Sequence, residues 1–257
     1  MTQQRLHGTW LVTGLRGTVA PKVAARVAEL GGEVVGWDRD AVAVDDAEAG
    51  AAYLASTRPA GIFHLAMGAE EWAGRLAAYA RDRELPFVYV SPASVFGNAP
   101  GDPDGPFTAQ DEPTARDDYG SDKSRCEAAV RAAYEGAVLA RIGWQADPDG
   151  RGNTMVAQLA AQADAAGGVV QASRRWRPAA SWMSDTAAAL VSLARSDRGG
   201  TVHLDSNAAD GWSFPDVVRH VARVSGHAWT VEEHDDLDHD GRLVGDEDLI
   251  PPLSARR

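Results

Sequence analysis

The chain of 257 residues contains a single cysteine, Cys126, so no internal disulfide can form and no cysteine-based metal site is expected. No stretch approaches the roughly 18 consecutive apolar residues that a membrane span requires, and the apolar run before Thr13 is too short for a secretory signal. Acidic residues outnumber basic ones, 37 to 25, and the net charge of −12 repels nucleic-acid backbones. We therefore expect a cytoplasmic protein that binds neither nucleic acid nor membrane.

The residues that are present suit a protein with a hydrophobic core, since 44% are hydrophobic and 24% are charged. Short apolar runs predict strands over residues 8–12, 33–37, 61–66, 87–90, 137–142, 201–204 and 228–233. Helical periodicity predicts helices over 19–30, 47–57, 70–83, 119–134, 153–166, 184–195 and 213–224. This alternation is typical of an α/β fold with a doubly wound parallel sheet of the Rossmann type.

A glycine-rich turn follows the first predicted strand. Gly14 and Gly17 lie where a tight turn and the close approach of a pyrophosphate require them, and Ala20 takes the place of a third glycine, where only a small side chain is needed. Asp38 ends the second predicted strand about 20 residues later, where a carboxylate accepts hydrogen bonds from an adenosine ribose. The spacing predicts a dinucleotide-binding turn.

The residues around this turn leave the choice of dinucleotide open. Asp38 favours NAD, whereas Arg39 beside it and Arg16 inside the turn suit the 2′-phosphate of NADP. The alternative interpretation of both arginines is solvated surface charge. NAD and NADP therefore both stand as candidate cofactors.

Tyr119 and Lys123 are four residues apart at the start of a predicted helix, so their side chains project from the same face. A nearby ammonium and a helix N-terminus favour the phenolate, which predicts that the pKa of Tyr119 lies below its ordinary value. Such a tyrosine can protonate a carbonyl oxygen as a hydride reaches the carbonyl carbon. The pair alone is a weak signal, but the glycine turn and the serines near the predicted strand end at 91–94 strengthen it.

These motifs resemble the extended short-chain dehydrogenase/reductase superfamily, and most closely its dTDP-4-dehydrorhamnose reductase group. The likeness covers nearly the whole chain, with these motifs in the family's order: the glycine turn, Phe63-His64-Leu65-Ala66, Val95-Phe96-Gly97, Asp118-Tyr119-Gly120-Ser121-Asp122-Lys123, Arg141-Ile142-Gly143-Trp144 and His203-Leu204. The resemblance implies that Tyr119 is the proton donor and that Lys123 holds the nicotinamide ribose. The residues expected at NAD or NADP are Gly14, Leu15, Arg16, Gly17, Asp38, Arg39, Leu65, Ala66 and Lys123.

The resemblance also implies a division of the chain. Residues 1–142 are expected to form the NAD(P)-binding Rossmann core, and residues 143–257 a smaller lobe that mainly binds a sugar nucleotide. The predicted strand at 201–206 is expected to return to the sheet. Because the helix that carries Tyr119 is a common pairing surface in this superfamily, the resemblance is compatible with a homodimer.

Two features depart from the family pattern. Pro92, which has no hydroxyl, stands where the family usually carries a catalytic Ser or Thr, and Ser91 and Ser94 are the candidates to replace it. The stretch between His64 and Tyr89 is shorter than in typical members. Both departures bear on catalysis, and they favour the alternative of a protein that binds the cofactor without turnover.

The segment Arg174-Arg175-Trp176-Arg177 places three guanidinium groups around one indole in an acidic protein. This combination suits a diphosphate and a stacked nucleobase, so we predict that these four residues bind the substrate. The alternative is a basic loop paired with surrounding carboxylates.

Residues from Asp236 to Glu247 have the spacing of a calcium loop. A predicted strand precedes the segment and Pro251-Pro252 follows it, so neither helix of a helix-loop-helix is present. We expect no metal, and the resemblance assigns the segment to a late substrate-side loop.

The leading hypothesis is therefore a reductase that uses NAD or NADP to reduce a keto group on a nucleoside-diphosphate sugar. The alternatives are a non-catalytic NAD(P)-binding scaffold or regulatory protein of the same fold, and an epimerase or tailoring reductase that acts on a non-nucleotide substrate.

Overall fold

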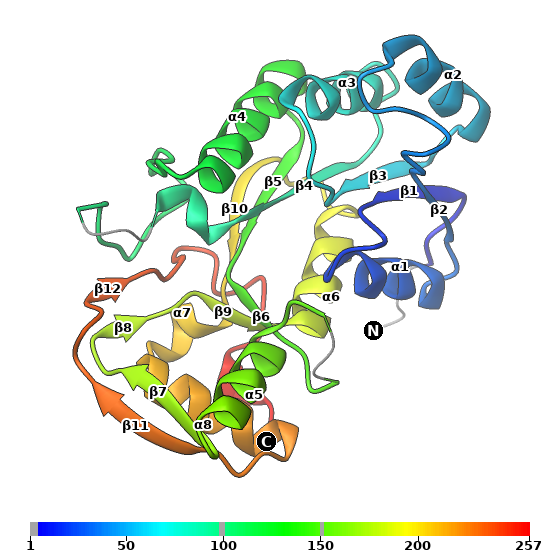
Figure 1. Cartoon of the computed structure of the whole chain (residues 1–257). Coiled ribbons are helices and arrows are strands. Elements are labelled where there is room, and N and C mark those ends of the chain that lie inside the picture. The colour runs from blue at the N-terminus through cyan, green and yellow to red at the C-terminus, as the bar shows by residue number, and fades with distance from the viewer. Residues whose placement is uncertain (1–4, 98–100, 150–151) are drawn as a thin grey trace. The chain divides into compact units, whose positions relative to one another are not determined.

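The computed structural model describes residues 5–97, 101–149 and 152–257, and the chain divides into two compact units (Figure 1). The first unit comprises Met1–Ser91, Arg116–Ala140 and Ala187–Val202, and the second comprises Pro92–Ala115, Arg141–Thr186 and His203–Arg257. The two units therefore interleave along the sequence. Residues 98–100, which belong to the long polar loop before Asp118, lie outside the described residues.

A six-stranded sheet runs through the first unit in the order β10-β5-β4-β3-β1-β2. Its strands are β1 (Thr9–Thr13), β2 (Glu33–Gly36), β3 (Gly61–His64), β4 (Phe87–Pro92), β5 (Val138–Ile142) and β10 (Gly200–Leu204). The pairs β1–β2, β1–β3 and β3–β4 are parallel. The prediction of an α/β fold with a parallel Rossmann-type sheet is confirmed.

The strand order contains a reversal beside β1. From β1 the chain crosses to β2 on one side and then returns to β3 on the other side, after which it continues outward to β4 and β5. In open parallel sheets, ligands bind outside the carboxyl ends of the strands at such a switch point. The fold alone therefore directs attention to the segments that follow β1, β2 and β3.

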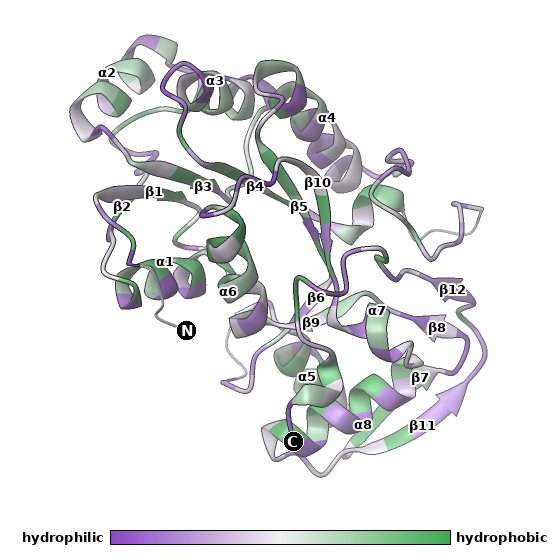
Figure 2. Cartoon of the chain, turned by 180° about the vertical axis from the view of Figure 1, so that it is seen from behind, coloured by the Kyte–Doolittle hydropathy of each residue, from purple (hydrophilic) through white to green (hydrophobic). Residues whose placement is uncertain are grey.

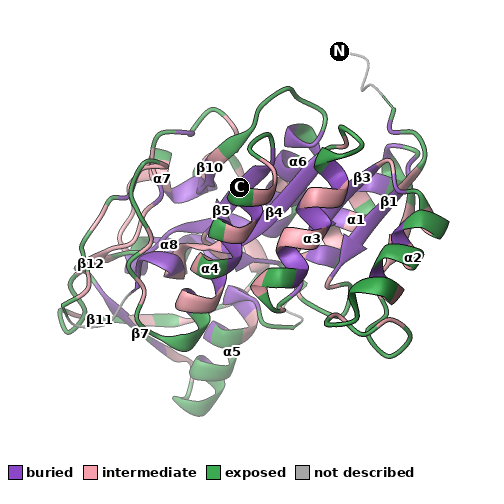
Figure 3. Ribbon diagram, turned by 90° about the horizontal axis from the view of Figure 1, so that it is seen from above, coloured by how far each residue is buried: buried purple, intermediate pink, exposed green. Residues whose placement is uncertain are grey.

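Helices cover both faces of this sheet. Three helices lie on one face, α2 (Ala47–Thr57), α3 (Glu70–Arg81) and α4 (Asp118–Ala133), and α1 (Ala20–Glu29) lies on the other (Figure 1). The strands β1, β3 and β4 are buried, whereas α2 exposes much of its surface (Figure 3). Asp46 and Asp117 begin α2 and α4, because their carboxylates accept hydrogen bonds from the first-turn N–H groups of Ala49 and Gly120, each at 2.9 Å.

The second unit has its own core of buried side chains, built around Trp182, Met155 and Leu159. Its helices are α5 (Met155–Ala165), α7 (Ser206–Asp210) and α8 (Phe214–Ser225), and α6 (Met183–Leu193) spans the division between the units. Short strands form parallel pairs: β6 (Trp144–Ala146) with β9 (Ala180–Trp182), β7 (Val169–Ser173) with β11 (Thr230–His234), and β8 (Trp176–Arg177) with β12 (His239–Asp240). Helix α8 is amphipathic, with an apolar face that includes Val217, Val218 and Val221 (Figure 2).

Asp205 connects three segments of the second unit. Its carboxylate accepts hydrogen bonds from the backbone N–H groups of Ala180 (2.9 Å), Asn207 (2.8 Å) and Leu243 (3.0 Å). The side chain is buried, and this burial raises its pKa to about 7 against the opposing effect of these hydrogen bonds.

Within the described residues, no helix is both long and apolar enough to cross a bilayer.

Candidate functional site

A crevice of about 900 Å³ lies in the first unit, where β1, β2 and β3 end. It brings together eight residues predicted at the cofactor: Gly14, Leu15, Arg16, Gly17, Asp38, Arg39, Leu65 and Ala66. Gly36, Trp37, Asp40 and Met67 also line it, and the sequence analysis did not single them out. Each of these four is within two positions of a predicted residue, so adjacency along the chain could have found them. The ninth predicted residue, Lys123, is not part of this lining.

The glycine turn after β1 packs closely against the backbone that follows β3. Gly14 has a φ of +82°, and a Cβ at this position would lie 3.0 Å from the backbone nitrogen of Ala66. The N–H of Gly17 donates to the carbonyl of Gly14 at 2.7 Å, which closes the turn. Helix α1 then begins without a side-chain cap and without an acidic residue in its first turn. The positive dipole end of this helix suits a diphosphate.

Thr13, the last residue of β1, is hydrogen-bonded to the segment that follows β3. Its Oγ1 accepts hydrogen bonds from the backbone N–H groups of Leu65 and Ala66, each at 3.1 Å, and lies 2.8 Å from Nδ1 of His64. Burial lowers the pKa of His64 to about 3, so the imidazole is neutral. Because Oγ1 already accepts from two N–H groups, its own O–H donates to Nδ1 of His64. The sequence analysis did not identify Thr13 or His64 as functional residues. Each is the last residue of its strand, β1 or β3, and their positions at two predicted strand ends are the signal that could have identified them.

Paired charges lie at the end of the crevice that follows β2, which is where the sequence analysis expected a ribose. Nη2 of Arg16 lies 3.5 Å from a carboxylate oxygen of Asp38 and 3.4 Å from one of Asp40. Arg39 instead donates to the carbonyl of Met67, and its guanidinium lies 5.2 Å from the ring centroid of Trp72. Both arginines that the sequence offered for a 2′-phosphate therefore already have partners.

Tyr119 and Lys123 lie on the first turns of α4 but in different environments. The Tyr119 side chain is 46% exposed, whereas Lys123 is buried, with its Nζ donating to the carbonyl of Val90 at 3.3 Å and lying 5.0 Å from the ring centroid of Tyr89. Burial, with the negative charge of Asp117, raises the pKa of Tyr119. The expectation of a lowered tyrosine pKa is wrong, because desolvation and the Asp117 carboxylate both favour the protonated phenol. Burial also lowers the pKa of Lys123 to about 8.

Two serines with buried hydroxyl groups lie at the end of β4. Ser91 is fully buried in β4, and Ser94 lies in the short 3₁₀ helix η1 (Ala93–Phe96) that Pro92 precedes. Both Oγ atoms are buried without a partner in the described part of the chain. They belong to different compact units, Ser91 to the first and Ser94 to the second.

Two arginines of the basic segment in the second unit form ion pairs with aspartates. Arg174 forms a two-point contact with Asp235 at 3.1 and 2.6 Å, and Arg175 pairs with Asp238. Arg177 is exposed, and no described carboxylate pairs with it. Trp176 packs 4.4 Å from Phe214 and 6.3 Å from Trp144, measured between ring centroids, so it forms part of an aromatic cluster.

The residues that resemble a calcium loop contact basic groups instead of one another. Asp238 pairs with Arg175, and Asp240 contacts Arg242 at 2.7 Å. Throughout residues 5–97, 101–149 and 152–257, no group of three or more His, Cys, Asp or Glu side chains is arranged to hold a metal ion.

Part of the chain is similar to a curated protein. The probable low-salt glycan biosynthesis reductase Agl14 of Haloferax volcanii is 31% identical over 138 residues, which is 53% of this chain. The match spans 45% of that relative, so the chain aligns with less than half of its length.

Solved structures share the fold. The dTDP-4-dehydrorhamnose reductase of Bacillus anthracis in complex with NADP superposes with a TM-score of 0.77 and 14% identity, covering 96% of each chain. The Bordetella bronchiseptica enzyme WbmH in complex with NAD⁺ gives a TM-score of 0.74 and 16% identity, covering 98% of this chain and 96% of that one. The family described as RmlD substrate binding domain matches residues 69–233. Because this match covers more than half of the sequence, the chain belongs to the RmlD substrate binding domain family.

Proposed function

We propose that this protein is a reductase that uses a nicotinamide dinucleotide to convert a keto group of a nucleoside-diphosphate sugar to an alcohol. The observation that carries the proposal is the crevice at the switch point of the sheet, where eight predicted cofactor residues meet and a Cβ at Gly14 would fill the turn. The family, the relative named as a reductase and the neighbours solved with NADP and NAD⁺ support it.

The chain's own residues would divide the work of binding along the crevice. Gly14, Gly17 and the start of α1 would hold the diphosphate, and Asp38 would accept hydrogen bonds from the adenosine ribose. Lys123 has one proton directed to the carbonyl of Val90, which leaves two ammonium protons for the nicotinamide ribose. The coenzyme, when bound, supplies the hydride.

Tyr119 would supply the proton. Its raised pKa keeps the phenol protonated at neutral pH, and the residue is 46% exposed. In reduction, the carbonyl oxygen would take the Oη proton as the carbonyl carbon gains the hydride, which gives an alcohol and leaves a Tyr119 phenolate that water reprotonates. A protonated phenol suits this direction better than the phenolate that the sequence suggested.

The charges at the ribose end favour NAD over NADP. Asp38 and Asp40 both hold Arg16, and Arg39 is engaged with the Met67 carbonyl and Trp72. A 2′-phosphate would have to displace these partners and lie beside two carboxylates, whereas a 2′-hydroxyl can donate to Asp38.

We further propose that residues 1–142 mainly bind the coenzyme and that residues 143–257 mainly bind the sugar nucleotide. Within the latter, Trp176 would stack on the base, and Arg177, with Arg174 and Arg175 released from their ion pairs, would contact the diphosphate. A homodimer that pairs through α4 is part of the same proposal.

The test is reduction of a panel of keto-sugar nucleotides with NADH, followed by coenzyme absorbance. The wild-type protein should turn over, and Tyr119→Phe should lose at least about 100-fold in kcat while its Kd for NADH changes less than twofold. A Tyr119→Phe protein that keeps its kcat would remove Tyr119 from the mechanism.

A second candidate function is favoured by Pro92 and by the buried, unpartnered Oγ of Ser91. In that case the protein binds the coenzyme as a scaffold or regulator and does not turn over. Coenzyme binding with no oxidation across the whole panel would support it.

A further inference from the structure

Two neighbouring residues of β4 contact the buried ammonium group of Lys123 in the first unit. Lys123 lies on α4 and is only 4% exposed. Its Nζ donates to the carbonyl of Val90 at 3.3 Å and lies over the ring of Tyr89, 5.0 Å from the ring centroid. The ammonium is therefore held by a hydrogen bond from one residue of the strand and by the ring face of the residue before it.

Tyr89 offers this cation an aromatic face without a negative charge. The side chain is fully buried, and burial raises its pKa, so the phenol stays neutral near neutral pH. An ammonium within about 6 Å of a ring centroid is attracted by the ring quadrupole, and the attraction is strongest where water is excluded. Both conditions hold for Lys123.

The other titratable groups around Lys123 come from α4 and from the end of β3. Burial lowers the pKa of Lys123 to about 8, and Cys126 and Glu127 on the same helix act in the opposite direction. Tyr119, one turn earlier, is protonated, and His64 at the end of β3 is neutral. Because the pKa of Lys123 lies close to neutral pH, the loss of one favourable contact would change how much of this lysine is charged.

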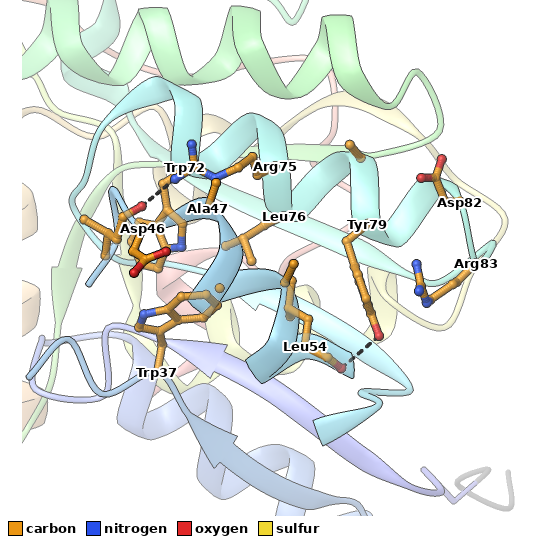
Figure 4. A pocket seen from close by; sticks show the side chains of 14 residues that line it. Trp37, Asp46, Ala47, Leu54, Trp72, Arg75, Leu76, Tyr79, Asp82 and Arg83 are labelled. Atoms are coloured by element: carbon orange, nitrogen blue, oxygen red, sulfur yellow. Dashed lines mark hydrogen bonds between the residues drawn. The ribbon is translucent and has the colours of Figure 1, made fainter. Parts of the chain in front are cut away.

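A second cation–ring pair of the first unit provides a contrast. Arg83 stacks on the ring of Tyr79 at 3.9 Å, beside the cavity between α2 and α3 (Figure 4). Arg83 is exposed, and the Tyr79 hydroxyl donates to the carbonyl of Leu54 at 3.0 Å. A guanidinium keeps its charge whatever ring lies beside it. Tyr79 is therefore a matched control position for changes at Tyr89.

We propose that Tyr89 is a positioning residue for Lys123, whose ammonium its ring face holds in the charged form and directs to the nicotinamide ribose. The inference rests on the proposed function, in which Lys123 binds this ribose. A deprotonated Lys123 would have two N–H donors instead of three, and the Val90 carbonyl already takes one. Tyr89 acts through Lys123 and has no contact of its own with the reacting atoms.

The experiment measures the charge state of Lys123 in the whole protein, labelled with ¹³C-lysine. The sequence contains two lysines, Lys22 and Lys123, so the Cε signal of Lys123 is assigned by its loss in Lys123→Met and Lys22 serves as the internal control. Tyr89→Phe keeps the ring face and should leave the pKa of Lys123 unchanged. Tyr89→pentafluorophenylalanine reverses the ring quadrupole at nearly the same shape and should lower this pKa by at least about one pH unit. Tyr79→pentafluorophenylalanine should leave it unchanged.

The Kd for NADH at two pH values is the second readout. If the charged form of Lys123 binds the ribose, a pKa lowered from about 8 by one pH unit should weaken NADH binding about fivefold at pH 8 and less than about twofold at pH 6.5. A defect in folding or packing alone would weaken binding equally at both pH values, and that result would contradict the proposed role.

Tyr89→Leu removes the ring altogether and repeats the test with a different shape, so the result does not depend on one variant. It should also lower the pKa of Lys123. The proposal is overturned if this pKa is the same in Tyr89→Phe, Tyr89→Leu and Tyr89→pentafluorophenylalanine. Absence of NADH binding by the wild type would contradict the proposed function instead, and the Lys123 signal of the free protein would still decide whether Tyr89 holds the ammonium.

Discussion

The coenzyme crevice of the first unit and the basic segment Arg174–Arg177 of the second unit are held together by different kinds of interaction. The crevice is joined by buried hydrogen bonds, in which Thr13 contacts His64, Leu65 and Ala66. The basic segment is joined by exposed ion pairs to Asp235 and Asp238, whose side chains are more than half exposed. Exposed pairs contribute less than about 1 kcal/mol each, so they break readily for a ligand. The strand ends that Thr13 joins are therefore fixed more firmly before binding than the basic segment, whose arginines can exchange their partners.

The largest effect is expected where buried hydrogen bonds hold the second unit together. Asp205→Ala removes the acceptor of three backbone N–H groups and should lower the free energy of unfolding by about 3 kcal/mol or more. Urea denaturation measures it, with Asp205→Asn as the matched variant that keeps one acceptor oxygen. A loss below about 1 kcal/mol in Asp205→Ala would mean that these bonds do not stabilise the unit.

The Asp205 carboxyl should make the free energy of unfolding depend on pH. Its folded-state pKa is raised to about 7 from 3.8, so between these values the folded state binds more protons than the unfolded state. The free energy of unfolding of the wild type, measured relative to Asp205→Asn, should therefore fall as the pH rises from about 4 to 7 and level off above 7. A difference that rises with pH over this range would show that the carboxyl is ionised throughout.

A smaller effect is expected at Thr13, which bonds the end of β1 to the segment after β3. Thr13→Val leaves the buried N–H of Ala66 and the half-buried N–H of Leu65 without this acceptor, which should lower the free energy of unfolding by about 2 kcal/mol and weaken NADH binding roughly tenfold. Thr13→Ser retains the hydroxyl and should stay within about threefold of the wild type. Because His64 is neutral down to about pH 3, both effects should be constant between pH 5 and 9, and a pH-dependent loss would contradict the assigned donor.

The next largest effect is expected on the ratio of NADP to NAD affinity, which Asp38 and Asp40 should control. Asp38→Asn combined with Asp40→Asn releases Arg16 and removes two negative charges, so the ratio of NADP to NAD affinity should rise about tenfold. Isothermal titration with both coenzymes measures the ratio, and Asp45→Asn combined with Glu48→Gln, both outside the crevice, is the charge-matched control. Tighter binding of NADP than NAD by the wild type would reverse the proposed preference.

The smallest effect is expected in the exposed basic segment. Arg177→Ala should raise the KM for a sugar nucleotide about fivefold, since this guanidinium has no ion pair to give up. Arg174→Ala should change the KM less than about twofold, because substrate contact there competes with Asp235. Equal effects of the two variants would show that the ion pairs do not distinguish them.

The same contrast explains how much could be predicted from the sequence. Residues of the glycine turn and Asp38 are close along the chain, and the strands that carry them have strong apolar runs, so both the fold and the lining of the crevice were predictable. The short strands β6, β8, β9 and β12 have two or three residues each and carry no periodic signal, so they escaped prediction.

Contacts between distant segments account for the remaining differences. The partners of Arg174 and Arg175 lie about 60 residues away, and only tertiary folding brings them together. The desolvation that raises the pKa of Tyr119 depends in the same way on packing that no local spacing encodes.

The most direct test of the central claim is calorimetric titration of NADH into the wild-type protein and into Gly14→Val. A side chain at the positive φ of Gly14, 3.0 Å from the Ala66 nitrogen, cannot be accommodated in the turn without strain. We predict saturable binding to the wild type with one NADH per chain, and a loss of at least about 100-fold in Gly14→Val with the circular dichroism spectrum preserved. Wild-type protein that binds neither NADH nor NADPH, or Gly14→Val that binds as tightly as the wild type, would contradict the account.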